Sequence, residues 1–477
     1  MSERIEASTD EYQNDNSGSI NSESLHQHSV AVTNGDRARG QITSASLNKL
    51  YPEDRPAHYW YRFVLSFPPH LVRNYIERFS IGSSHRVLDP FCGTGTCIVE
   101  CKKLGISSVG IEANPMAHFA AKVKIDWGPD PDGLVEHACQ IAEAARCELE
   151  SVGIEDDPLP LFSANRREPH SLRTLPPEQQ RLLLTDSISP LPLHKTLVLL
   201  DHLRRNSDRR YHDHELLALA KALVYSISNL HFGPEVGVGP AKSDAPVIAA
   251  WLAAVRAMAD DLRKLKGYKG APAVVHHLDS RQALDVLEPG SIDLVITSPP
   301  YPNEKDYTRT MRLESVLLGF IRNKADLQAL KRKLLRSNTR NVYKDDTDDQ
   351  WVCAHQEIQR IAEAIEARRI ELGKTSGFER LYAKVTKLYF GGMARHLANL
   401  RKLLRPGAHL AYVVGDQASY LRIMIRTGKL LADIAQSLGY ELVSIDLFRT
   451  RLATATKEQL REEVVVLRWP GGASGLE

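Results

Sequence analysis

The stretch TSPPY, residues 297–301, places a hydroxyl group, a rigid backbone and an aromatic ring directly after an apolar run. The preceding run, residues 292–297, is rich in β-branched side chains and predicts a buried strand. The two prolines cannot continue a strand or a helix, because each fixes its own φ and lacks a backbone N–H. Open α/β sheets bind their ligands at the ends of strands. The serine and the tyrosine are therefore candidates for a binding site.

A second stretch, DPFCGTGT over residues 89–96, follows a predicted strand and opens a helix at about Thr96. Gly93 and Gly95 let a ligand approach the backbone, and the N-terminus of the helix faces that ligand. The stretch lacks the Gly-Lys-Ser/Thr ending of a phosphate-binding loop, and Ile98 breaks the dinucleotide pattern Gly-x-Gly-x-x-Gly. Taken alone, it fits a tight turn as well as a ligand site.

Two acidic residues follow the neighbouring predicted strands. Glu112 comes 17 positions after Gly95, where a carboxylate can accept hydrogen bonds from both hydroxyls of a ribose. Asp279 ends a third strand, where it can accept from an adenine amino group. Either residue alone is more often a strand-end cap or a solvated charge. Together with the glycine-rich turn, they outline a pocket for an adenosine-bearing ligand.

Strands and helices alternate along the chain once two long segments, 127–268 and 302–378, are set aside. The last two strands have no helix between them, which is typical of an antiparallel edge hairpin. We therefore expect an α/β fold, a doubly wound Rossmann-like sheet with an edge hairpin and two helical insertions. Before that hairpin, a helix is expected from about residue 420 to 438. Residues 229–247 predict an ordered loop that either enters a groove or joins two helices.

The composition is that of a soluble globular protein, with 43% apolar and 25% charged residues and a net charge of +2. A nucleic-acid surface must therefore be a local patch. We see no apolar run of 18 residues and no secretory signal, so we expect a cytoplasmic protein without a membrane span. The cysteines fit reduced thiols without zinc-site spacing, so no metal is expected: Cys92, Cys97, Cys101, Cys139, Cys147 and Cys353.

One basic run stands out against this balance. Residues 302–344 hold eleven Lys/Arg and four acids, 11 − 4 = +7, directly after the TSPPY stretch. The run could contact phosphates, or it could be the solvated face of an amphipathic helix. Its position beside TSPPY makes the two interpretations about equal.

The pair of motifs resembles the DNA methyltransferases that use S-adenosylmethionine to methylate base amino groups, cytosine N4 or adenine N6. The likeness covers about residues 51–126, 271–310 and 380–470. The segment FPPHLV, residues 67–72, is similar to the family segment that closes over the methionine end of the cofactor. The resemblance implies a cofactor set of Phe67, Pro68, Asp89, Pro90, Phe91, Gly93, Gly95, Thr96, Glu112 and Asp279. It implies a catalytic set of Ser298, Pro299, Pro300 and Tyr301.

The resemblance also gives these residues roles and divides the chain. Ser298 and the Pro299 carbonyl would accept hydrogen bonds from the target amine, and Tyr301 would stack on a flipped base. Double-stranded DNA is the implied partner, together with a cognate restriction endonuclease if the enzyme serves a restriction-modification or phage-defence system. The expected division begins with a disordered tail (1–45) and the first part of the core (46–126), followed by a helical insertion (127–268). The core with the catalytic motif (269–310), a basic helical insertion (311–378) and the last part of the core (379–477) complete it.

The subclass stays open between several alternatives. A serine at position 298 is commoner among cytosine-N4 enzymes, whereas Asp or Asn is commoner among adenine-N6 enzymes. Here the cofactor motif precedes the catalytic motif, whereas many family members have the reverse order. A tRNA guanine-N2 methyltransferase has a similar cofactor turn, but usually an Asp-Pro-Pro-Tyr motif and an N-terminal RNA-binding domain. A nucleic-acid binder with an inactive core would not need both motifs intact.

Overall fold

The computed structural model describes residues 50–61, 66–156, 171–232, 236–268, 270–303, 305–452 and 459–472. The disordered tail expected over 1–45 lies outside the described residues.

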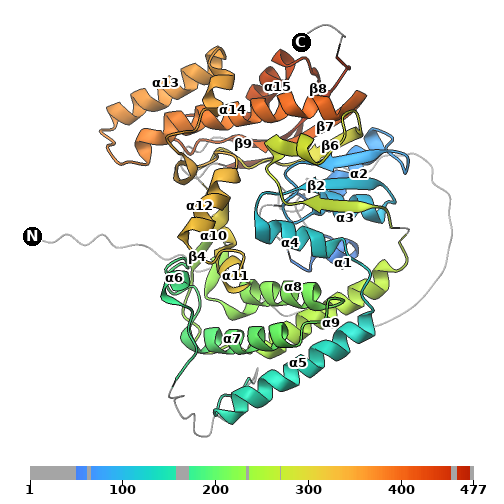
Figure 1. Ribbon diagram of the computed structural model, residues 1–477. Coiled ribbons are helices and arrows are strands. Elements are labelled where there is room, and N and C mark those ends of the chain that lie inside the picture. The colour runs from blue at the N-terminus through green and yellow to red at the C-terminus, as the bar shows by residue number, and fades with distance from the viewer. Residues whose placement is uncertain are drawn as a thin grey trace, which may run out of the picture. The chain divides into compact units, whose positions relative to one another are not determined.

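A seven-stranded sheet forms the centre of the core, in the order β5-β2-β1-β6-β7-β9-β8 (Figure 1). The first five strands in this order pair in parallel, whereas β9 is antiparallel to both β7 and β8. The doubly wound α/β fold and its antiparallel edge hairpin are thus confirmed. The strands are β1 (Arg86–Asp89), β2 (Ser107–Ile111), β5 (Ala273–His276), β6 (Ile292–Thr297), β7 (Leu404–Gly415), β8 (Glu441–Leu452) and β9 (Gln459–Arg468).

The chain changes direction across the sheet at β1, which lies between β2 and β6. In this register Leu88 pairs with Val295, so the carboxyl ends of β1 and β6 lie side by side. Such a switch point leaves a crevice outside the strand ends, because the connections on either side leave in opposite directions. The glycine-rich turn and the TSPPY stretch both begin there.

Helices cover both faces of the sheet, which explains why a central strand such as β6 is a nearly continuous apolar run. Val87 and Leu294 face one side, where they share a core with α2 (Pro69–Arg78) and α3 (Thr96–Lys103). Leu88 and Val295 face the other side, with α14 (Tyr382–Leu400) and α15 (Thr427–Ser437). Helix α13 (Gln356–Glu371) packs on α14, and Figure 1 shows these three helices together.

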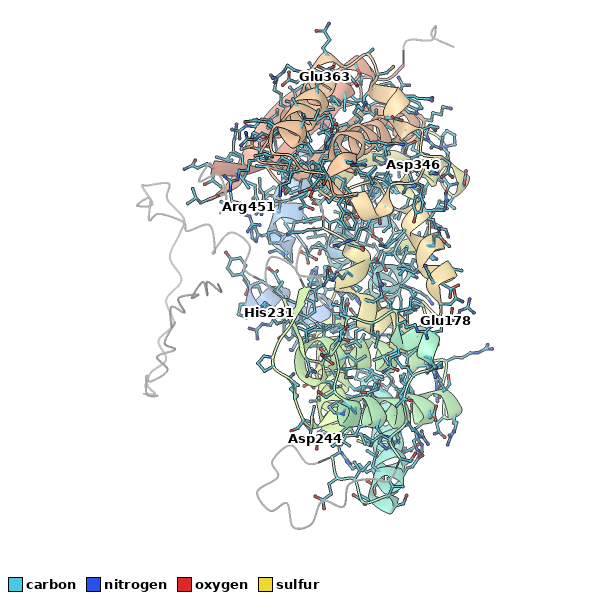
Figure 2. The ribbon with its side chains drawn as sticks, turned by 90° about the vertical axis from the view of Figure 1, so that its left-hand side faces the viewer. Glu178, His231, Asp244, Asp346, Glu363 and Arg451 are labelled. Atoms are coloured by element: carbon cyan, nitrogen blue, oxygen red, sulfur yellow. The ribbon has the colours of Figure 1, made fainter. Side chains whose placement is uncertain are left out.

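The first insertion is a group of helices (Figure 1), and its apolar core is continuous with α3 and α4 (Pro115–Lys124) beside the sheet. The loop expected over 229–247 contains an antiparallel hairpin, in which His231 pairs with Gly237; Figure 2 labels His231. That hairpin is β3 (Leu230–Phe232) and β4 (Val236–Val238). The helices from β2 to β5 are α4, α5 (Pro131–Ser151), α6 (Pro177–Gln180), α7 (Pro190–Arg205), α8 (His212–Ala222), the π-helical turn η3 (Leu223–Ile227) and α9 (Val247–Leu265).

The second insertion alternates short helices with turns. Its turn η6 lies directly on α14, since a Cβ added at Gly391 would come 1.9 Å from the Asp348 carbonyl oxygen. The insertion holds α10 (Tyr307–Thr310), α11 (Arg312–Leu317), α12 (Lys324–Lys333), η5 (Thr339–Asn341), η6 (Asp348–Val352) and α13. The remaining short turns are η2 (Pro52–Asp54), α1 (Arg55–His58), η4 (Ser280–Asp285), η7 (Glu379–Leu381) and η8 (Arg401–Leu403).

The expected helix from about residue 420 begins later, at Thr427. Leu421 and Arg422 have φ of +53° and +66°, a conformation that no right-handed helix contains. A short bridge between Gln417 and Ile425 closes this turn instead. The prediction placed the start of this helix too early, because the helical spacing of apolar residues continues before Thr427 into a segment that forms a turn.

Candidate active site

The glycine-rich turn joins β1 to α3 and uses its two glycines differently. Both have positive φ, +52° at Gly93 and +85° at Gly95. A Cβ added at Gly93 would meet nothing within 4 Å, and this residue lines a large cavity. A Cβ added at Gly95 would lie 3.1 Å from the Ala121 Cβ, so Gly95 lets α3 pack against α4. Only Gly93 leaves backbone open toward the cavity.

Glu112 fixes this turn to the end of β2. Its Oε2 accepts a hydrogen bond from the Gly93 N–H at 2.8 Å, and its Oε1 accepts from the Asn114 N–H at 2.7 Å. Burial raises the pKa of Glu112 to about 7, although hydrogen bonds from the backbone N–H groups of Asn114, Gly93 and Ala113 favour the charged form. The side chain lines the cavity, and the carboxylate keeps acceptor capacity for a ligand.

Asp89 lies beneath the cavity, with no exposed surface, and joins β1 to β6. Its Oδ1 accepts from the Thr297 hydroxyl at 2.6 Å and from the Phe91 N–H at 3.2 Å. Its Oδ2 has no hydrogen-bond partner among the described residues. Burial raises the pKa of Asp89 to about 7, and the nearby Glu112 carboxylate raises it further. Asp89 therefore orients the turn from below.

The TSPPY stretch leaves β6 beside the end of β7. The Ser298 hydroxyl donates to the Val413 carbonyl at 3.1 Å, and the Ser298 side chain also makes a hydrogen bond with that of Tyr301. The oxygen therefore keeps a lone pair, but not its full acceptor capacity, for a ligand. The ring of Tyr301 lies against the backbone of Gly415, where an added Cβ would come 2.9 Å from the Tyr301 Cε2. The Tyr301 N–H donates to the Tyr307 hydroxyl at 3.2 Å. Burial and the Glu462 carboxylate raise the pKa of Tyr301.

One cavity at the switch point gathers most of the predicted residues. Pro68, Asp89 and Gly95 do not line it; they lie behind its wall, and their part in cofactor binding stays a prediction. The predicted residues that line the cavity are Phe67, Pro90, Phe91, Gly93, Thr96, Glu112, Asp279, Ser298, Pro299, Pro300 and Tyr301. Both predicted sets thus meet in a single hollow.

Asp279 caps the turn that follows β5 and is held by its own neighbour. Arg281 donates to it from the backbone N–H at 3.0 Å, from Nε at 3.0 and 3.1 Å, and from Nη2 at 2.6 Å. These three donors take most of the about four lone-pair positions of the carboxylate. The side chain still lines the cavity.

The cavity also contains residues that the sequence did not single out. Arg449 and Arg451 reach it from β8, the edge strand, and Figure 2 labels Arg451. Arg449 donates from Nε to Glu462 on β9 at 2.5 Å. The two arginines are spaced by two residues, so alternation along a strand could have placed both on one face. Tyr307 and Lys333 have no comparable signal, because they lie at the ends of α10 and α12, which reach the cavity through the tertiary fold.

Several cations of the basic run over 302–344 form ion pairs within the fold, among them Arg322, Lys331, Arg332 and Arg336. Lys331 has 13% side-chain exposure and lies 2.8 Å from Asp306, whereas Arg332 has 46% and lies 2.7 Å from Asp345. Lys333, the next residue, lines the cavity instead. The sequence left this run open between phosphate contact and a solvated helix face. In the structure the three side chains of this triplet have different surroundings, because consecutive residues of a helix point in different directions.

The described residues offer little to two other kinds of site. No group of three or more His, Cys, Asp or Glu side chains among them could hold a metal ion. None of their helices is both long and apolar enough to cross a bilayer.

The family model and two relatives that match along most of this chain agree on one class of known protein. The family model described as DNA methylase, of the N6/N4 type, matches residues 5–122. Type II methyltransferase M.BsoBI of Geobacillus stearothermophilus is 23% identical, and the match covers 90% of this chain and 86% of that protein. Type II methyltransferase M.AvaI of Anabaena variabilis is 24% identical, with 90% and 89% covered.

A more local likeness reaches a different substrate class. The tRNA (guanine(10)-N2)-dimethyltransferase of Methanothermobacter thermautotrophicus is 27% identical over 28% of this chain and 30% of that protein. The two type II methyltransferases match along most of their length, and the family model agrees with them. The comparisons therefore support an amino-methylating DNA methyltransferase of the N6/N4 type, a class that implies S-adenosylmethionine as the methyl donor.

Proposed function

We propose that this protein methylates the exocyclic amino group of a base in a specific DNA sequence, and that the base is cytosine, modified at N4. The observation that carries the base-amine target is the hydrogen bond from Ser298 to the Val413 carbonyl. Because the hydroxyl proton is used there, the oxygen presents a lone pair toward the cavity. The choice of cytosine rests on the serine itself, which at this motif position is commoner among the cytosine-N4 enzymes that the sequence resembles. The adenine N6 amino group is the alternative target, since it needs the same acceptors.

The chain's own residues account for activation of the amine. An exocyclic amine is a poor nucleophile, because its lone pair is delocalised into the ring. Acceptors at its two N–H groups, the Ser298 oxygen and the Pro299 carbonyl, would draw the nitrogen toward sp³ geometry. The two prolines hold that carbonyl rigidly. Direct transfer of a methyl group to the activated amine needs no covalent enzyme intermediate. The reaction therefore depends on positioning and electrostatics.

Access to the amine requires the base to leave the duplex. Tyr301 would stack on the extruded base and recover part of the cost of extrusion, about 1–3 kcal/mol by analogy with single-strand stacking. Gly415 lies against this ring and keeps room for it. The ring would thus hold the base beside Ser298, three positions before it in the same rigid corner.

The other half of the cavity fits an adenosine-bearing cofactor. The Glu112 carboxylate keeps acceptor capacity for ribose hydroxyls, and the open backbone at Gly93 allows close approach beside the N-terminus of α3. Bound S-adenosylmethionine would supply an electrophilic methyl group on a sulfonium. Phe67 and Pro90 would bound the methionine end.

The proposed partner is double-stranded DNA, and a cognate restriction endonuclease would complete a restriction-modification system in the cytoplasm. The test is nucleoside mass spectrometry on DNA from cells that express the wild type or Ser298→Ala. We expect N4-methylcytosine with the wild type alone. N6-methyladenine instead would select the alternative target, and unmodified DNA from both cultures with methylated tRNA would exclude a DNA substrate.

A further inference from the structure

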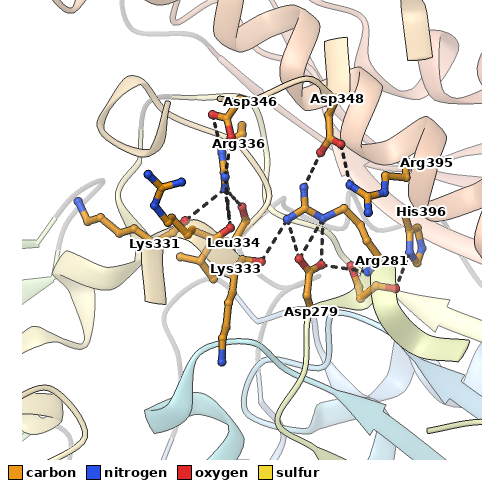
Figure 3. A network of polar contacts seen from close by, with 12 residues as sticks. Asp279, Arg281, Lys331, Lys333, Leu334, Arg336, Asp346, Asp348, Arg395 and His396 are labelled. Atoms are coloured by element: carbon orange, nitrogen blue, oxygen red, sulfur yellow. Dashed lines mark hydrogen bonds and ion pairs between the residues drawn. The ribbon is translucent and has the colours of Figure 1, made fainter. Parts of the chain in front are cut away.

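A buried arginine links the cavity to the second insertion (Figure 3). Arg281, with 9% exposure, holds Asp279 through three donors and reaches Asp348 with its remaining terminal nitrogen, Nη1 to Oδ2 at 2.5 Å. Asp279 follows β5, whereas Asp348 lies 67 residues after Arg281 in the turn η6. One guanidinium therefore bridges two carboxylates from separate parts of the chain.

The far end of this bridge is fixed to α14. The Asp348 backbone lies against Gly391, where an added Cβ would come 1.9 Å from its carbonyl oxygen. Arg395 donates to the Asp348 Oδ1 at 3.1 Å. Asp348 does not line the cavity, so it acts on the cavity only through Arg281.

Next to Asp279, the second insertion forms part of the cavity wall. Residues 333, 334, 335 and 337 line the cavity together with Asp279. Arg281 donates from Nη2 to the Lys333 carbonyl at 3.4 Å. Tyr420 donates to the Ser337 carbonyl at 3.0 Å, which holds the other end of the segment. The wall and the carboxylate are thus held by one network.

We propose that Arg281 is a positioning residue for adenine recognition: it orients the Asp279 carboxylate and, with Asp348, holds residues 333–337 against the adenine. The inference rests on the proposed function, because it assumes an adenosine-bearing cofactor. Arg281 fills about three of the four lone-pair positions of Asp279. One position is left, and an amino group can donate to it, whereas a carbonyl oxygen would be repelled.

The test compares S-adenosyl-L-homocysteine with S-inosyl-L-homocysteine, in which an oxygen replaces the adenine amino group. Calorimetry measures both affinities for the wild type, Arg281→Lys and Asp348→Asn. The ratio of the two affinities does not depend on how much of a variant is folded. We expect the preference for the adenosine ligand to fall about tenfold in both variants, the loss of one hydrogen bond to a charged acceptor.

Asp345→Asn is the matched control, since it makes the same change in the same insertion at an exposed ion pair with Arg332. Its ratio should equal that of the wild type. An unchanged ratio in Arg281→Lys and Asp348→Asn would overturn the inference while leaving the proposed function intact. A wild type that binds neither ligand would instead overturn the proposed function.

A second measurement needs no variant. Hydrogen exchange of the wild-type chain, with and without S-adenosyl-L-homocysteine, should show slower exchange of the amides in residues 333–337. Unchanged exchange in this segment, with protection at Gly93, would mean that the cofactor binds without the wall and that the inference is wrong.

Discussion

Replacing Glu112 by Gln should change the pH dependence of stability and the pH dependence of cofactor affinity in opposite directions. The carboxylate is buried and accepts from the backbone N–H groups of Gly93 and Asn114. Gln has one acceptor oxygen and one NH₂ group. One of the two backbone N–H groups would therefore face another donor, at a cost of about 1–3 kcal/mol.

Ionised Glu112 destabilises the folded chain at alkaline pH, because its charge is buried. Burial raises its pKa from 4.5 to about 7, which corresponds to at most about 3 kcal/mol against the charged form in the folded chain. The folded protein holds this proton more tightly than the unfolded chain. The stabilisation that comes from protonated Glu112 is therefore complete below about pH 4.5 and is lost as the pH rises through about 7. Gln stays neutral and has no such loss.

The two effects predict a crossover that thermal or denaturant unfolding can measure. At about pH 5 the Gln variant should be less stable than the wild type by about 1–3 kcal/mol, the cost of the lost hydrogen bond. Between about pH 5 and pH 8 the free energy of unfolding of the wild type should fall relative to the variant by about 2–3 kcal/mol. A difference that does not change with pH would refute a raised pKa at Glu112.

The cofactor affinity of the wild type relative to the Gln variant should rise with pH, whereas its relative stability falls. Ribose hydroxyls donate to a carboxylate, so the affinity for S-adenosyl-L-homocysteine should fall about 10- to 100-fold in the Gln variant at about pH 8. The wild type should lose affinity as the pH falls below about 7, and the variant should not. Asp89 also titrates at about 7. If the variant kept the pH dependence of the wild type, Asp89 would be the titrating group and the role of Glu112 would be wrong.

Three further predictions concern the base side of the cavity and the DNA. Gly415→Ala should push the Tyr301 ring aside, because the new Cβ would lie 2.9 Å from its Cε2; single-turnover methylation should fall roughly 100-fold with cofactor affinity unchanged. Gly82→Ala, which meets nothing within 4 Å, is the neutral control. A mismatch at the target base should rescue part of the methylation lost in Tyr301→Ala, which impairs base capture, but little of that lost in Ser298→Ala, which impairs amine activation; equal rescue would contradict this division. Arg332→Ala should lower the slope of log K against log salt for DNA binding by about 0.9 if its side chain meets one phosphate. Lys331→Ala should leave that slope unchanged and instead lower the melting temperature, because it strips a buried Asp306 of its partner.

The parts of the fold that could be predicted from the sequence depend on local patterns. Apolar β-branched runs such as residues 292–297 marked the strands, and the glycine-rich turn marked the strand-to-helix junction at β1. The sheet order then follows from right-handed crossovers, which bring the ends of β1 and β6 together. The meeting of Glu112, Asp279 and Ser298 in one cavity is a consequence of that topology, so it was accessible without coordinates.

Other features depend on contacts that leave no local pattern. The bridge from Arg281 to Asp348 spans 67 residues, and either residue alone looks like an ordinary surface charge. The late start of α15 follows from positive φ at Leu421 and Arg422, residue types that give no warning of it. Gly95 has the same motif position as in a ligand-binding turn, yet here its missing side chain serves helix packing.

The number of basic residues in a run does not give the positive charge that DNA can meet, because some of these residues are paired within the fold. Asp306 caps α10, and its Oδ1 accepts a hydrogen bond from the Thr308 N–H at 3.0 Å. Although burial opposes it, Lys331 lowers the pKa of this carboxylate through an ion pair at 2.8 Å. The pair ties the end of α12 to the loop that starts at Ser298. A cation in such a pair has little field left for a phosphate. We therefore expect the insertion to act first on the position of the TSPPY stretch, and we expect exposed cations such as Arg332 to contact the DNA.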